Sequence, residues 1–401
     1  MNRLTNTIRP YAWGSPTAIP ELLGVAPTGE PQAEMWMGAH PGAPSLVDRG
    51  AGPQPLDAVI DADPAAELGE AVVKRFGPRL PFLLKVLAAA APLSLQVHPD
   101  LAQARAGYAD EEARGIPVDA PERNYKDPNH KPEMIVALSP FEGLCGFRRP
   151  AEAADLLEAL GVPGLTPYVD ILRAHPEDQA LREVLAAVLG ADPEETAAAV
   201  RAATEAAARL AGRPGPHADA YRAYAQAARS FPGDRGILAA MLLNHVRLRP
   251  GEALYLGAGI PHAYLDGLGV EIMANSDNVL RCGLTPKYID VPELQRIVRF
   301  EAGEPGVLRP EAGPEGEELY PAPIDEFRLS RYLLAPGADP RALPAGTPQI
   351  LLCTSGRAHL RTPGKPHTAL TLTPGQSAYV PASEQVRITG DGTLFRATVT
   401  A

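Results

Sequence analysis

Cysteine is scarce in this sequence, which has three cysteines among 401 residues. They are Cys145, Cys282 and Cys353. Because their number is odd and they lie far apart, we expect no disulfide framework. The opening residues, MNRLTNTIRPYAWG, also lack the apolar stretch of a secretory signal. These two absences predict a protein of a reducing compartment, the cytoplasm.

Long hydrophobic runs are absent as well. A helix needs about 20 apolar residues to cross a bilayer. The longest apolar run, 83–95, is shorter than that and is interrupted by Lys85, Pro92 and Ser94. We therefore expect no membrane partner.

Basic charge is in deficit. Lysine and arginine number 37 against 48 acidic residues, which makes a formal net charge of −11. Because affinity for nucleic acid rests on a basic surface, no nucleic-acid partner is expected. The charged fraction of 21% and the hydrophobic fraction of 45% are typical of a globular protein, and the length allows two or three domains.

Proline and glycine, with 44 and 37 residues, are spread along the chain and favour short strands joined by turns. The segment 150–240 differs, because it is rich in alanine and has helical periodicity. Within it, Asp192 and Pro193 followed by Glu195 form a typical helix start. We expect this segment to be an α-helical insertion between β regions.

A weak internal repeat is present in segments 246–265 and 369–390, each with a Pro-Gly turn between two apolar runs. The first repeat resembles the second sequence motif of the cupin family. It keeps two motif glycines and the histidine, His262, while Gly257 replaces a proline and Asp266 replaces an asparagine. In that motif a strand turns at glycines and presents one histidine to the mouth of a small barrel.

The second repeat departs further from the motif. It keeps Gly375 and Pro381, but Ser383 replaces a glycine and Val386 replaces the histidine. A barrel with valine at this position lacks the metal ligand, so we expect a metal ion in the first barrel alone. The expected fold is mainly β, with two jelly-roll cupin barrels and a helical insertion. The expected boundaries are 1–149 and 241–300 for the first cupin domain, 150–240 for the insertion, 301–323 for a linker and 324–401 for the second, degenerate cupin domain.

Three separated segments offer ligands for a metal ion. Gln96 and His98 are two residues apart, so on a strand their side chains point to the same face. Glu133 lies in NHKPEM, and His262 is the motif histidine. Two imidazoles, one carboxylate and one amide oxygen suit Zn²⁺, with Mn²⁺ or Fe²⁺ as alternatives. His130, close to Glu133, is a rival ligand.

The other six histidines have no partners at ligand spacing, and only the first of them could line the site. They are His40, His175, His217, His245, His359 and His367.

Several segments together resemble the type I mannose-6-phosphate isomerases, zinc enzymes of the cupin superfamily. These segments are YAWG at 11–14, AEMWMGAHPGAPS at 33–45, PFLLKVLAAAAPLSLQVHPD at 81–100, YKDPNHKPEM at 125–134, FEGLCGFR at 141–148 and GIPHAYLDGLGVEIMANSDNVLRCGLTPKYIDV at 259–291. The last segment and NHKPEM are the most specific. The resemblance weakens in 150–240 and is only architectural beyond about residue 310.

The resemblance implies one zinc ion per chain, with ligands at Gln96, His98, Glu133 and His262. It implies the interconversion of D-mannose 6-phosphate and D-fructose 6-phosphate through a cis-enediol, in a monomer that supplies GDP-mannose synthesis. The residues assigned to catalysis are Lys131, Glu271, Asp277 and Arg281. Those assigned to substrate binding are Trp13, His40, Ser94, Tyr264 and Lys287.

The chemistry narrows these roles only in part. The oxyanion that develops on the enediol needs positive charge, which the metal ion and the always-ionised Arg281 can supply. The carrier of the proton between C2 and C1 needs a tunable group. Its candidates, which the sequence does not separate, are Glu271, Lys131, Asp277 and His40. The candidates for binding the phosphate are Lys287, Arg281 and Ser94.

Two other functions stay open from the sequence: a metal-stabilised regulator that binds sugar phosphates, and an iron-dependent cupin dioxygenase. A regulator needs no proton carrier, so Glu271 and Arg281 beside a complete ligand set disfavour it. The amide ligand Gln96 and the lysine near Glu133 disfavour the dioxygenase.

Overall fold

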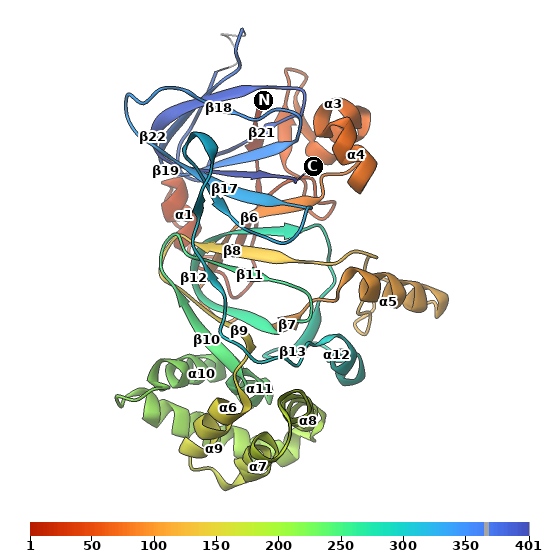
Figure 1. The fold of residues 1–401 in the computed structure, drawn as a ribbon, viewed down its shortest axis with the longest axis vertical. Coiled ribbons are helices and arrows are strands. Elements are labelled where there is room, and N and C mark those ends of the chain that lie inside the picture. The colour runs from red at the N-terminus through yellow and green to blue at the C-terminus, as the bar shows by residue number, and fades with distance from the viewer. Residues whose placement is uncertain (365–368, 401) are drawn as a thin grey trace.

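The computed structural model describes residues 1–364 and 369–400. Two β regions are stacked along the long axis of the molecule, and a group of helices forms one end (Figure 1). Strand and helix occur in about equal amounts, so the expectation of a mainly β chain is wrong. None of the described helices is both long and apolar enough to span a membrane.

The helices expected in 150–240 are present, and they follow one another between strands β9 (Phe141–Phe147) and β10 (Leu243–Leu248). They are α6 (Pro150–Ala159), the 3₁₀ helix η1 (Pro163–Leu165), α7 (Thr166–Ala174), α8 (Glu177–Gly190), α9 (Pro193–Ala211), α10 (Ala218–Ser230) and α11 (Gly236–Met241). Their apolar faces share one core, in which buried alanines such as Ala203 and Ala227 let the helices approach closely. This core also includes strand residues such as Leu280, so the helices pack on the neighbouring sheet.

Further helices lie outside 150–240, in regions that the sequence predicted to be β. These helices are α1 (Ala18–Leu23), α2 (Leu56–Ala62), α3 (Pro64–Leu68), α4 (Glu70–Phe76), α5 (Leu101–Ala113), α12 (Val291–Ile297) and the 3₁₀ helix η2 (Pro314–Gly316). Their starts carry ordinary signals, because Asp63 caps α3 ahead of Pro64, and Asp100 forms a capping box with Gln103 at α5. The frequent proline and glycine around them concealed these signals.

Within residues 1–364 and 369–400, the strands form two antiparallel sheets of eleven strands each. The central sheet contains β2 (Thr7–Arg9), β3 (Glu34–Met37), β6 (Phe82–Ala89), β7 (Leu95–Val97), β8 (Glu133–Ala137), β9 (Phe141–Phe147), β10 (Leu243–Leu248), β11 (Ala253–Leu256), β12 (His262–Ala274), β13 (Leu280–Gly283) and β14 (Val307–Leu308). The terminal sheet contains β1 (Asn2–Thr5), β4 (Leu46–Asp48), β5 (Pro53–Pro55), β15 (Glu311–Ala312), β16 (Glu317–Tyr320), β17 (Arg328–Leu334), β18 (Arg341–Leu343), β19 (Gln349–Arg361), β20 (Leu370–Leu372), β21 (Ser377–Val380) and β22 (Val386–Thr398).

The long strand β12 organises the central sheet. Its first residue, His262, is the Cα partner of Gln96 on β7. Further along, Glu271 is the partner of Lys85 on β6, and β8, which starts at Glu133, pairs with the same half of β12 on its other side. Residues that are far apart in the sequence are thus brought to one face of one sheet.

The segment 301–323 is not a free spacer, as its Pro, Gly and Glu content had indicated. Its strand β14 pairs with β11 of the central sheet, whereas β15 and β16 belong to the terminal sheet. Tyr320 is buried and donates a hydrogen bond to the carbonyl oxygen of Gly251 at 3.0 Å. Composition alone did not reveal these strands, because they are short and lie in a segment rich in proline, glycine and glutamate, and the partner of β14 lies about 50 residues earlier in the sequence.

The two sheets share an apolar core, and strands from the beginning of the chain belong to both of them. Phe82 and Ile272 of the central sheet belong to the same cluster as Tyr379 and Phe395 of the terminal sheet. The first strand of the chain, β1, pairs with β21 near its end rather than with the central sheet. The expected first cupin domain, 1–149, therefore contributes three strands, β1, β4 and β5, to the terminal sheet.

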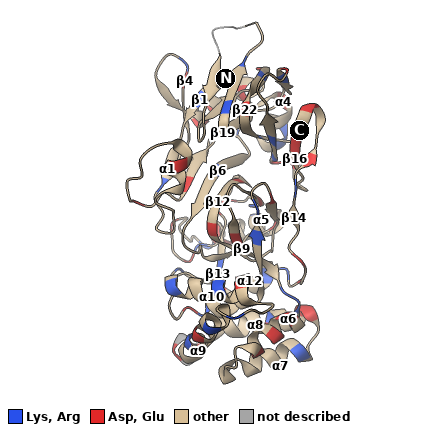
Figure 2. Ribbon diagram, turned by 90° about the vertical axis from the view of Figure 1, so that its left-hand side faces the viewer, with Lys and Arg blue, Asp and Glu red and all other residues tan. Residues whose placement is uncertain are grey.

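In the terminal sheet, the position at which the cupin motif would have a histidine ligand lies in an apolar cluster. Val386 is fully buried in a cluster with residues such as Leu360 and Leu394. The absence of metal from this region stays a prediction. Figure 2 shows basic and acidic residues interspersed over both sheets and the helices.

Candidate metal centre and cleft

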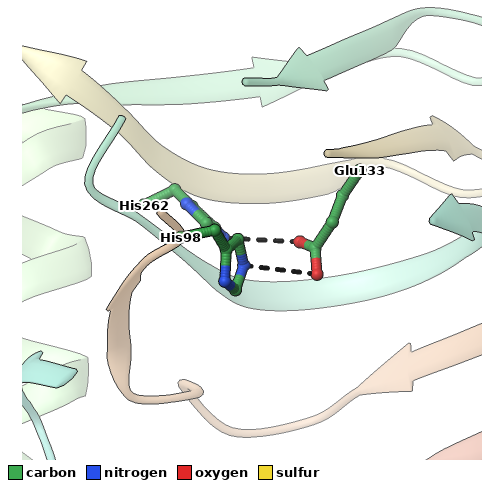
Figure 3. A group of neighbouring side chains, drawn as sticks. All are labelled: His98, Glu133 and His262. Carbon is green, nitrogen blue, oxygen red and sulfur yellow. Dashed lines mark ion pairs between the residues drawn. The ribbon is translucent and has the colours of Figure 1, made fainter. Parts of the chain in front are cut away.

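Three buried side chains meet where β7, β8 and β12 come together. His98 follows β7, while Glu133 and His262 are the first residues of β8 and β12. The Nε2 atom of His98 lies 3.3 Å from Oε1 of Glu133, and that of His262 lies 3.4 Å from Oε2 (Figure 3). Among the described residues, this is the group of histidine, cysteine and acidic side chains that could hold a metal ion.

Both histidines are oriented by backbone carbonyl groups. Nδ1 of His98 lies 2.8 Å from the carbonyl oxygen of Asn278, and Nδ1 of His262 lies 2.9 Å from that of Ile260. Each Nδ1 must therefore carry the proton and donate it, which leaves the lone pair of Nε2 for a cation. Burial lowers the pKa of His98 to about 4, so its ring is neutral at pH 7. Nε2 of His98 has no hydrogen-bond partner among the described residues, which fits a metal ligand.

The carboxylate of the trio is held in its ionised form. Burial opposes ionisation, but Lys131 and His98 outweigh it and keep the pKa of Glu133 well below its usual value. Nζ of Lys131 lies 3.1 Å from Oε1 of Glu133. Gln96, opposite His262, lines the same cleft and can add an amide oxygen. Two imidazoles, a carboxylate and an amide match a zinc site with room for substrate.

Asn278 ties the loops around this centre together. Its side-chain oxygen accepts hydrogen bonds from the backbone of Lys126 and Asp127, at 2.7 and 3.2 Å. Its side-chain amide donates to the carbonyl oxygens of Asp127 and Asn129, at 2.7 and 2.8 Å. Because its own carbonyl group orients His98, Asn278 links the segment that leads to Glu133 with a histidine ligand.

We predict that Asn278→Ala weakens zinc binding by about tenfold or more, because losing the side-chain hydrogen bonds to 126–129 loosens the loop whose backbone carbonyl group, which alanine retains, orients His98. Competition with a chromophoric chelator measures this affinity. The matched control is Asn124→Ala, because that side chain donates to Asp290 at 2.9 Å and contacts none of the three ligands. Equal zinc affinity in the two variants would contradict the role of Asn278.

A cleft of about 960 Å³ opens beside the metal trio. Every residue that the sequence suggested for the site lines it except the rival ligand His130 and the completely buried His98. The lining residues among them are Trp13, His40, Ser94, Gln96, Lys131, Glu133, His262, Tyr264, Glu271, Asp277, Arg281 and Lys287. Five of the six sequence segments that carried the resemblance, all except 141–148, therefore contribute residues to one cavity.

A buried lysine between two carboxylates lies in the wall of the cleft. Nζ of Lys85 is 3.0 Å from Glu271 and 3.5 Å from Glu34, and all three side chains are buried. Burial lowers the pKa of Lys85, but Glu271 and Glu34 outweigh it, so the net shift is upward and the ammonium form persists. Burial raises the pKa of Glu271 despite the opposing charge of Lys85, which brings this carboxyl closer to neutral pH.

Two further polar groups face the cleft. Nε2 of His40 lies 3.5 Å from Oδ1 of Asp277, and this histidine lowers the pKa of that carboxyl. The buried hydroxyl of Tyr264 has no hydrogen-bond partner among the described residues, and burial together with Glu271 raises its pKa. It is therefore a protonated donor available to a bound molecule.

Four cations line the cleft without an ion-pair partner in the described part of the chain, namely Arg9, Lys126, Arg281 and Lys287. The charge of Arg281, then burial and Lys126, lower the pKa of Lys287, which shows that these last three lie near one another. Uncompensated cations in a cleft form a site for an anion. Arg281 is also the strand partner of Gln96, so it stands between this anion site and the metal centre.

The rival ligand His130 points elsewhere, with Nε2 2.6 Å from Oε1 of Glu326. Four other histidines contact groups outside the cleft, namely His175, His217, His245 and His359. His367 lies outside the described residues. The sequence did not single out Lys85, Glu34, Lys126 or Asn278, although Lys85 was visible as a charge inside an apolar run.

Comparison with known proteins gives consistent results. The family model for the catalytic domain of type I phosphomannose isomerase matches residues 1–150. The chain is 44% identical over 400 residues to mannose-6-phosphate isomerase of Escherichia coli (strain K12), covering 99% of both chains.

Solved structures resemble the entire fold. The crystal structure of a mutant of phosphomannose isomerase from Salmonella typhimurium aligns with a TM-score of 0.91 and 41% identity, over 100% of both chains. A zinc-bound mannose 6-phosphate isomerase aligns with a TM-score of 0.90 and 40% identity, over 100% of this chain and 99% of the other.

Proposed function

Because the chain belongs to the type I mannose-6-phosphate isomerase family, we propose that it interconverts D-mannose 6-phosphate and D-fructose 6-phosphate with the help of one zinc ion. The observation that carries this proposal is the convergence of three elements in one cleft. They are the trio around Glu133, the buried carboxyl of Glu271 and the unpaired cations that include Arg281.

The proposed zinc ligands are Gln96, His98, Glu133 and His262. When bound, a zinc ion there supplies a Lewis acid that polarises oxygen atoms of the sugar. The chain itself keeps the ligands ready, because both histidines donate Nδ1–H to backbone carbonyl groups, which directs Nε2 to the centre, and Glu133 is ionised.

We assign the transfer of the carbon-bound proton to Glu271. Its carboxylate takes the proton from C2 and returns it to C1, while the electron pair left on carbon moves through the cis-enediol. Its raised pKa suits a group that must accept and release a proton near neutral pH. Lys85, which stays charged, holds this carboxylate in place at 3.0 Å.

The hydroxyl proton must move from O2 to O1 for the reaction to balance. The ammonium group of Lys131 can donate one proton to O1 and take another from O2, since it lines the cleft beside Glu133. Arg281 provides fixed positive charge for the enediol oxygen, and Lys287 with Lys126 binds the phosphate. The hydroxyl of Tyr264 can donate to a further sugar oxygen, and Trp13, Ser94 and the His40–Asp277 pair complete the walls.

We further propose that the protein works as a monomer in the cytoplasm and that its reaction supplies mannose 6-phosphate for GDP-mannose synthesis. The matches to metabolic isomerases over the full chain support this placement.

A coupled assay for fructose 6-phosphate tests the activity. We expect turnover of mannose 6-phosphate that a chelator abolishes and zinc restores, with far slower turnover of unphosphorylated mannose. Glu271→Gln should lower kcat by about 10²- to 10⁴-fold, the usual contribution of a general base, with zinc retained. Asp277→Asn, the matched control, should lower it less.

Binding of sugar phosphate without turnover would favour the regulator, and metal-dependent uptake of dioxygen would favour the dioxygenase. Either result would contradict the proposed isomerase.

A further inference from the structure

The helical insertion reaches the cleft at one point, the turn 231–235 between α10 and α11. Ser230 and Phe231, at the end of α10, line the cleft together with the loop 284–287 that follows β13. In the same turn, Asp234 contacts both the insertion and this loop. Its Oδ1 accepts a hydrogen bond from the backbone of Gly236 at 2.6 Å, and its Oδ2 accepts one from the backbone of Thr285 at 2.8 Å.

The loop that Asp234 holds has a constrained backbone. Leu284 is fully buried and has a φ of +53°, the left-handed region that a branched side chain rarely occupies. Gly236 approaches it so closely that a Cβ atom would lie 2.4 Å from the backbone nitrogen of Leu284. Such a conformation persists only where its surroundings impose it, and here the insertion does so.

The backbone conformation of Leu284 sets the direction of the residues that follow it. Directly after it, the backbone N–H of Lys287 donates to the hydroxyl of Thr285 at 3.1 Å, which closes a tight turn. Thr285 and Lys287 both line the cleft next to Arg281. The position of the cation at 287 therefore depends on a chain of contacts that begins at Asp234.

We propose that Asp234 is a positioning residue through which the helical insertion shapes the anion subsite of the cleft. This inference rests on the proposed function in that the anion is the phosphate group of the substrate. The insertion thus determines how tightly phosphorylated sugars bind, although its helices supply no group to the proton transfer.

The first experiment measures Asp234→Ala for binding of inorganic phosphate by calorimetry and for steady-state kinetics with mannose 6-phosphate. We expect both the Kd for phosphate and the KM to rise by about tenfold, with kcat changed less than twofold and zinc content unchanged. Loss of binding that is uniform between ground and transition states raises KM alone. Asp234→Asn, which keeps one acceptor oxygen, should show a smaller rise and serves if the alanine variant does not fold.

The matched control is Asp192→Ala. Asp192 caps α9 in the same insertion by accepting a hydrogen bond from the backbone of Glu194 at 2.8 Å, far from the loop in sequence and with no contact to it. It should lower the melting temperature of the protein while leaving KM and phosphate binding unchanged. A merely structural role for Asp234 predicts the same pattern as this control.

A double variant tests whether Asp234 acts through the loop. If it does, Asp234→Ala combined with Lys287→Ala should raise KM little more than Lys287→Ala alone, because the two changes remove the same interaction. Unchanged phosphate binding in folded Asp234→Ala or Asp234→Asn, or full additivity in the double variant, would overturn the proposal. Phosphate binding needs no turnover, so a wild-type protein that binds phosphate but lacks isomerase activity would contradict the proposed function and not this inference.

Discussion

Replacing His262 with alanine is expected to remove the metal ion and to lower kcat by about a thousandfold or more. His262 contributes one of the three buried donor atoms that converge at the centre, and its Nε2 faces Glu133 at 3.4 Å. A cysteine can also bind zinc, and Cys145 is the strand partner of His262. Burial raises the pKa of this thiol to about 12, so it does not offer a thiolate at neutral pH.

Elemental analysis of the purified variant, together with the coupled assay, checks this outcome. His130→Ala is the matched control and should keep both zinc and activity, because His130 pairs with Glu326 outside the cleft. Zinc retained at one ion per chain in His262→Ala would show that the ligand assignment is wrong. Zinc bound at two ions per wild-type chain would contradict the expectation of no metal near Val386.

Replacing Arg281 with alanine is expected to lower kcat by about a hundredfold or more, as the loss of an oxyanion donor does. Arg281 is the strand partner of Gln96 and lines the cleft, and in the proposed mechanism it faces the enediol oxygen that develops charge. A contact that exists only in the transition state affects kcat. Lys287→Ala, by contrast, should mainly raise KM, because a phosphate contact is present in ground and transition states alike.

Both variants should be compared at confirmed zinc content, by steady-state kinetics with mannose 6-phosphate. The structure makes this a demanding comparison, since Arg281 also lowers the pKa of Lys287 and so lies close to the anion subsite. An arginine variant with unchanged kcat and raised KM would mean that the two roles are reversed.

The chemistry of the centre was accessible from the sequence because it depends on residue type within short motifs. The segment NHKPEM contains Lys131 and Glu133, and the glycine-rich motif ends in His262, so these candidate ligands can be identified from the sequence. The helices of 150–240 were also predictable, since alanine content, periodicity and caps are local properties of the chain.

What only the tertiary structure decided is how distant residues pair. In the sequence, Lys85 is a single charged residue in an apolar strand. In the fold, β12 places Glu271 and β3 places Glu34 beside it, and these carboxylates make it possible to bury its charge. Burial in turn shifts the pKa of Glu271 upward, and no sequence pattern reports burial.

The same reasoning applies to the mistaken parts of the fold. The segment 301–323 has the composition of a spacer, yet it forms strands, because β14 pairs with the distant β11 at Ala253 and β16 pairs with β17 at Tyr332. The turn at Asp234 carries no motif, and its role depends on the close approach of Gly236 to Leu284 across the interface of helices and sheet. Local sequence determined the ligands and the helices of the insertion, whereas long-range pairing and burial decided which charges meet and what they can do.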